Sequence, residues 1–96
     1  MSYHVVVTPA IRARIGSLDL PNDVLVDVFT RLAGLANNPA AQLTRPASPF
    51  DGMMLVIELI DHSDRMCVHE FAFRVWYSMD ETQLLVGMPT YTKQYG

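Results

Sequence analysis

The order of two sequence patterns constrains this chain more than any other feature. A helical first half is followed by three segments that alternate as strands do, at residues 53–61, 65–77 and 82–88. Short turns join these segments, which predicts an antiparallel meander of hairpins. A β-branched and aromatic segment at residues 3–8 predicts one more strand before the helices. The order β-α-α-β-β-β predicts an α+β fold, in which a helical hairpin packs on one face of a small, mostly antiparallel sheet.

Two helices are expected between residue 9 and residue 36. Thr8-Pro9 is typical of an N-cap followed by proline at the first helical position. The second helix is predicted to end at Asn37-Asn38-Pro39, and residues 39–52 are predicted to form a loop. Its apolar positions share one helical face: Leu25, Val28, Phe29, Leu32, Leu35 and Ala36.

Length and composition indicate one globular domain spanning residues 1–96. Half of the 96 residues are hydrophobic, which excludes a disordered tail. The single cysteine excludes an internal disulfide and fits a reducing cytosol. We read no leader sequence and no apolar run long enough to span a membrane, so we expect a cytoplasmic protein without membrane contact.

One face of the predicted sheet carries both charged and apolar side chains. The fully apolar or aromatic side-chain sets are expected to pack on the helices, which turns Glu58, Glu70 and Arg74 outward. An apolar patch among such charges indicates a surface that contacts a dimer mate or a bound peptide. The alternative is that the C-terminal tail or the 39–52 loop covers it. The residues predicted to bind a partner are Met54, Val56, Ile60, Val68 and Trp76.

Four short segments resemble one known family. Residues 3–10 (YHVVVTPA), 31–39 (RLAGLANNP), 73–81 (FRVWYSMDE) and 84–87 (LLVG) are similar to segments of the RelE/ParE toxins. These are the toxins of bacterial toxin–antitoxin systems. Together with the predicted element order, the resemblance covers nearly the whole chain. It implies a toxin that is neutralised by an antitoxin protein.

The resemblance also implies an activity and a set of residues. RelE-like members inhibit translation by cleaving mRNA on the ribosome, and their strand arginine corresponds to Arg74. Tyr91, Lys93 and Tyr95 on the predicted tail are candidates for the other catalytic groups. Arginine can stabilise charge that develops on a phosphate, and tyrosine can stack on a base or transfer a proton.

The distribution of charge favours an alternative without catalysis. The chain has seven basic and ten acidic residues, a net charge of −3. Residues 50–81 hold seven of the acidic residues and only Arg65 and Arg74 as basic ones. A negative surface repels RNA phosphates. The alternative is a binding protein on the same fold, either a ParE-like toxin directed at DNA gyrase or a member that has lost its chemistry. Arg74 then becomes a cross-strand partner of Glu58 or Glu70.

No metal and no cofactor are expected from the sequence. Asp61, His62 and Asp64 are close along the chain, but nothing supplies a fixed fourth ligand. His69 is interpreted as a hydrogen-bonded core histidine that points toward the helices. Cys67 is interpreted as a small buried thiol on a strand.

Overall fold

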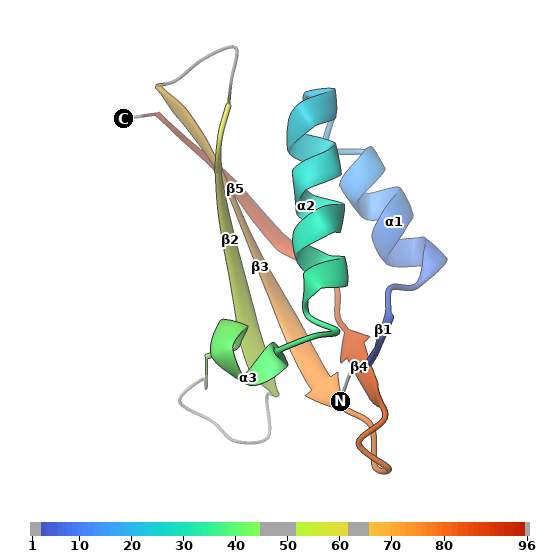
Figure 1. Cartoon of the computed structure of the whole chain (residues 1–96). Coiled ribbons are helices and arrows are strands. Elements are labelled where there is room, and N and C mark those ends of the chain that lie inside the picture. The colour runs from blue at the N-terminus through green and yellow to red at the C-terminus, as the bar shows by residue number, and fades with distance from the viewer. Residues whose placement is uncertain (1–2, 45–51, 62–65, 96) are drawn as a thin grey trace.

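The computed structural model describes residues 3–44, 52–61 and 66–95. In this part of the chain, three helices and five strands form a two-layer α+β fold (Figure 1). The elements are, in chain order, β1 (His4–Val6), α1 (Pro9–Gly16), α2 (Asn22–Gly34), α3 (Pro39–Gln42), β2 (Met53–Ile60), β3 (Cys67–Tyr77), β4 (Gln83–Val86) and β5 (Thr90–Tyr95). The predicted fold class is confirmed, and α3 and β5 are additions to the predicted order.

The helical hairpin forms as predicted, but α2 ends at Gly34, before the predicted stop at Asn37, and Val24, which was not in the predicted apolar set, is buried. The Thr8 hydroxyl accepts a hydrogen bond from the backbone N–H of Ile11 at 3.4 Å, and Pro9 opens α1. In α2 the buried stripe is Val24, Val28 and Leu32, one residue every turn. Figure 1 shows α1 and α2 on the same side of the sheet.

The predicted 39–52 loop is more ordered at its start than expected. Pro39 begins the one-turn helix α3, and the Gln42 side-chain amide donates to the Gly34 carbonyl at 3.1 Å. Thr44 then forms an isolated antiparallel bridge with Met54. The rest of this loop, at 45–51, lies outside the described residues, as does the predicted turn at 62–64.

The sheet has one parallel pairing and is otherwise antiparallel. Its strand order is β1-β4-β3-β2, and β5 also pairs with β3. The N-terminal strand β1 runs parallel to β4. Strands β4 and β5 pair one after the other with the same edge of β3. The sheet therefore includes both the N-terminal strand β1, which pairs with β4, and the C-terminal strand β5.

The C-terminal tail was predicted wrongly as a segment beyond the sheet. It is strand β5, which pairs with β3 from Ala72 back to Cys67. Val86 is opposite Val75, and Thr90 is opposite Ala72. The chain therefore advances four residues from Val86 to Thr90 while β3 advances only three, so one residue is extra. This extra residue is a β-bulge, and Pro89 is tolerated within it because a bulge interrupts the ladder of hydrogen bonds.

The core lies between the helices and one sheet face. The inward residues of β2 and β3 are the predicted apolar sets, and Leu55, Ile57, Phe71, Phe73 and Val75 are buried. They pack with the buried stripe of α2 and with Ile11 and Ile15 of α1 in one cluster. The residues between them on each strand therefore point away from the helices, as predicted.

Candidate functional site

The four residues predicted to be catalytic do not share a site. Arg74 lies opposite Met54 on the outward sheet face. Tyr91, Lys93 and Tyr95 lie opposite Phe71, His69 and Cys67, respectively, and thus on the side of the sheet that bears the helices. The sheet separates Arg74 from the other three residues.

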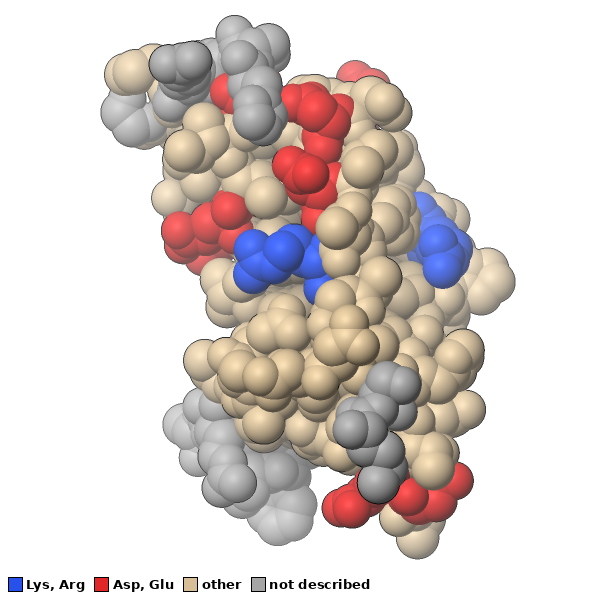
Figure 2. Space-filling model, viewed as in Figure 1, with Lys and Arg blue, Asp and Glu red and all other residues tan. Residues whose placement is uncertain are grey.

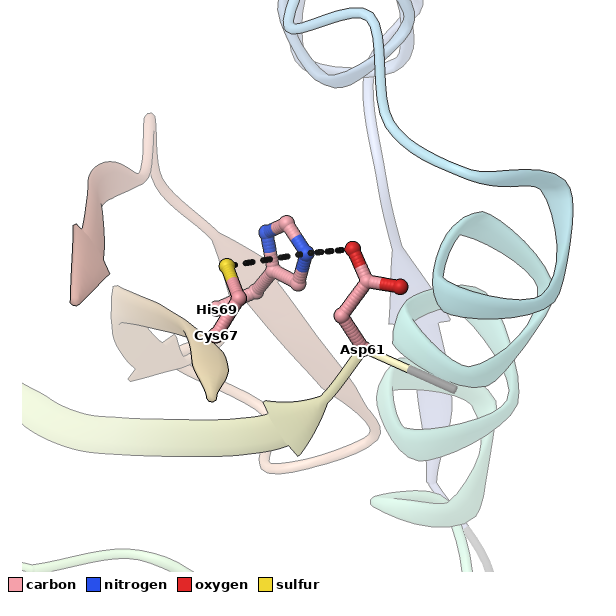
Figure 3. A group of neighbouring side chains, drawn as sticks. All are labelled: Asp61, Cys67 and His69. Atoms are coloured by element: carbon pink, nitrogen blue, oxygen red, sulfur yellow. Dashed lines mark hydrogen bonds and ion pairs between the residues drawn. The ribbon is translucent and has the colours of Figure 1, made fainter. Parts of the chain in front are cut away.

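Tyr91 instead joins a chain of hydrogen bonds at the end of the sheet. Its hydroxyl lies 2.6 Å from Nδ1 of His69, and Nε2 of the same imidazole lies 3.2 Å from Oδ2 of Asp61. The thiol of Cys67 is 3.9 Å from this Nε2 atom. Figure 3 shows Asp61 and Cys67 both directed at the His69 ring. His69 is 2% exposed, which agrees with its interpretation as a core histidine.

Strand register assembles this cluster. The backbone N–H of Asp61 donates to the carbonyl of Cys67 at 3.0 Å, directly after the pairing of Ile60 with Val68. Asp61 and Cys67 therefore face each other, and His69 follows Cys67 on the same face of β3. Along the chain Asp61 is nearest to His62 and Asp64, which lie outside the described residues. The missed signal was the Cys-x-His spacing at the start of β3, together with an aspartate directly after the end of β2.

The pKa shifts of Tyr91 and Lys93 on β5 leave both side chains in their ordinary protonation states. Burial raises the pKa of Tyr91, and Lys93 opposes this shift, so the phenol stays protonated at neutral pH. The hydrogen bond with Tyr95 raises the pKa of Lys93, so this ammonium group stays charged. The Lys93 Nζ atom lies 5.4 Å from the centroid of the Tyr95 ring. Lys93 and Tyr95 thus interact with each other, on the same strand as Tyr91.

Replacing Tyr91 by phenylalanine is expected to lower the free energy of unfolding by about 1–2 kcal/mol, because it removes a hydrogen bond to a buried imidazole. Urea denaturation measures this loss. Tyr95→Phe is the control, since Tyr95 is exposed and its variant should stay within about 0.5 kcal/mol of the wild type. Equal losses in both variants would show that the His69 contact contributes nothing specific.

The predicted partner-binding residues lie on the outward face. Val56, Ile60 and Trp76 are 43%, 58% and 39% exposed, while Met54 and Val68 are half-buried. The tail does not cover this face, because it is strand β5 within the sheet. The indole of Trp76 instead lies against Gly52 and Gly87: an added Cβ would come within 2.6 Å of the ring at Gly52 and 2.8 Å at Gly87.

An acidic pair lies on this face next to the terminal pair of Ile60 and Val68. Glu58 and Glu70 are directly opposite each other in the β2–β3 register, and the Gln94 side-chain amide donates to Glu70 at 3.1 Å. Like charges in this arrangement are destabilising. The register places Arg74 directly opposite Met54.

The side of the molecule that bears α1 and α2 has no continuous basic area among the described residues in Figure 2. Figure 2 shows acidic groups over the N-terminal half of α2, at the β2 edge and at the β3–β4 turn. Basic groups form two separate spots, over the C-terminal half of α2 and over α1. In the described ranges, no helix is long and apolar enough to cross a membrane.

Comparison with known proteins leaves the family open. No family model, no curated protein and no solved structure matches this chain. The resemblance to RelE/ParE toxins therefore depends on the short segments and on the order of the elements.

Proposed function

We propose that this chain is the RelE/ParE-like toxin component of a bacterial, cytoplasmic toxin–antitoxin pair, and that it acts through protein–protein contacts. The single observation that carries the proposal is the outward sheet face. Helices α1 and α2 lie on the other side, and no described helix or strand covers Val56, Ile60 and Trp76. Exposed apolar side chains gathered on one sheet face are typical of a protein interface.

The face has a pattern that a protein segment can match. Trp76 pairs with the exposed Leu85 at one end, and Ile60 pairs with Val68 at the other. The Glu58–Glu70 pair lies between these two apolar ends. We infer that the occupant is an antitoxin segment that crosses the face, with apolar side chains at both ends and a lysine or arginine between them. That cation would relieve the repulsion between the two carboxylates.

Cleavage of mRNA is the less favoured function. It would require Arg74 to work with Tyr91, Lys93 or Tyr95, and these lie on opposite faces of the sheet. The acidic pair on the face of Arg74 also opposes the approach of RNA phosphates. A toxin directed at DNA gyrase, or a degenerate member, would need only a protein interface.

The test is induced expression in a bacterium, with and without the protein encoded by the adjacent reading frame. We expect growth arrest with intact mRNA, relief by the neighbouring protein, and a complex of the two. The Val56→Lys/Ile60→Lys double variant should weaken this complex about tenfold or more, because it places charges in the apolar face. Val26→Lys is the matched control, since Val26 is 54% exposed on α2, on the opposite side of the molecule from this face.

Three outcomes would contradict the proposal. Induction without growth arrest would exclude a toxin. A complex that loses affinity equally in the β2 variant and in Val26→Lys would place the antitoxin elsewhere. Arrest with cleaved mRNA that Arg74→Ala abolishes would establish the nuclease instead.

A further inference from the structure

The cluster at the end of the sheet combines three kinds of metal-binding atom. Asp61 offers a carboxylate oxygen, Cys67 a sulfur and His69 an imidazole nitrogen, and all three donor atoms lie within 4.8 Å of one another (Figure 3). We infer that Asp61, Cys67 and His69 form a zinc site that joins the end of β2 to the start of β3. This inference is independent of the proposed toxin function.

The distances in the cluster are close to those that zinc requires. Bonds of 2.3 Å to sulfur and about 2.0–2.1 Å to nitrogen and oxygen place tetrahedral ligands about 3.4–3.6 Å apart. The thiol of Cys67 is 3.9 Å from Nε2 of His69, and Oδ2 of Asp61 is 3.2 Å from the same atom. No pair of the donor atoms is more than 4.8 Å apart, so the atoms would move closer together when they bind one ion. The fourth tetrahedral position remains for water or another donor.

The chemistry of the donor set selects zinc over harder cations. Magnesium and calcium prefer oxygen ligands alone, whereas thiolate with imidazole favours zinc. Charge also matches, because one Zn²⁺ ion neutralises the Asp61 carboxylate and the Cys67 thiolate together. Both side chains are buried, with Cys67 0% and Asp61 6% exposed, so an ion held between them would be largely shielded from solvent.

Tyr91 completes the site from behind the histidine. Its hydroxyl lies 2.6 Å from Nδ1, whereas the contacts with Asp61 and Cys67 are made by Nε2 of the same ring. With the metal on Nε2, the ring proton is on Nδ1 and is donated to the Tyr91 oxygen. The thiol proton leaves to solvent as the sulfur binds. Partners of this kind orient a ligating histidine and strengthen its bond to the metal.

Cobalt binding tests the site, because Co²⁺ replaces Zn²⁺ and a cobalt–thiolate bond absorbs light. Cys67 is the only cysteine in the chain, so such a band reports on this cluster alone. The full-length protein is stripped with a chelator and titrated with Co²⁺. We expect a thiolate-to-cobalt charge-transfer band that saturates at one ion per chain and is displaced by Zn²⁺. Zinc should also raise the midpoint of thermal unfolding by roughly 5–10 °C.

Variants separate this site from accidental binding. Cys67→Ser should abolish the band, and Tyr91→Phe should keep it while weakening zinc affinity about 10- to 100-fold. His4→Gln is the control, since His4 is exposed on β1 outside the cluster and its variant should bind as the wild type does. A wild-type protein without the thiolate band, or zinc affinity that Cys67→Ser leaves unchanged, would overturn the inference. If Cys67→Ser does not fold, the wild-type spectrum alone decides.

Discussion

Replacing Phe71 by alanine is expected to lower the free energy of unfolding by about 3–5 kcal/mol. Phe71 is fully buried between the sheet and the helices. Its ring centroid lies 5.0 Å from that of Tyr91 and 6.4 Å from that of Phe73. Truncation would remove these contacts and leave a cavity that rigid neighbours fill only in part. Because small domains are stable by only about 5–15 kcal/mol, this loss would approach the stability of the whole domain.

Urea denaturation followed by circular dichroism measures this effect as a lower transition midpoint. Phe29→Ala makes the same truncation on α2. The Phe29 ring is half-buried, and the Cζ atom of Arg12 lies over it at 5.4 Å from the ring centroid. We expect a loss of about 1–2 kcal/mol there, because less apolar area returns to water. Similar losses at the two positions would show that the core is not centred on β3.

Replacing Gly52 by alanine is expected to destabilise the protein by about 2–4 kcal/mol. Gly52 has a φ of 77°, where a side chain costs about 1–2 kcal/mol. The added Cβ would also lie 2.6 Å from Nε1 of Trp76, and displacing a packed ring costs about 1–3 kcal/mol more. Thermal unfolding measures the combined loss.

Gly16 supplies the control for this substitution. It lies in α1, and nothing comes within 4 Å of a Cβ added there. Gly16→Ala should therefore be neutral or stabilising by up to about 1 kcal/mol. Adding Trp76→Leu to Gly52→Ala should recover the steric part of the loss but not the backbone part, a coupling that a double-mutant cycle measures. Losses that simply add would show that the indole does not constrain Gly52.

Much of the fold could be predicted because its determinants are local. The N-cap at Thr8, the apolar spacing of α2 and the alternation along β2 and β3 each depend on neighbours a few residues away. Alternation alone assigned Val56 and Trp76 to the outward face and Phe71 to the core, as observed. β5 was missed because Pro89 is a strong signal for the end of a strand.

The candidate sites depend on pairing between strands, which the sequence does not encode locally. Asp61 and His69 are eight residues apart, and only the register of β2 on β3 brings their side chains to 3.2 Å. The spacing along the chain instead suggested Asp61 with His62 and Asp64. A predicted register for β2 on β3 would have placed Asp61 beside Cys67 and His69.

Side-chain alternation is a local property of extended backbone, so the residue pattern was enough to predict the two faces of β2 and β3. The face on which Tyr91 lies depends instead on how β5 pairs with β3. The bulge between Val86 and Thr90 inserts one residue, and one residue moves every later side chain to the other face of the sheet. This one extra residue places Tyr91 beside His69 and on the opposite face from Arg74. The register is set by the pairing of β5 with β3, which the residues of β5 do not specify by themselves.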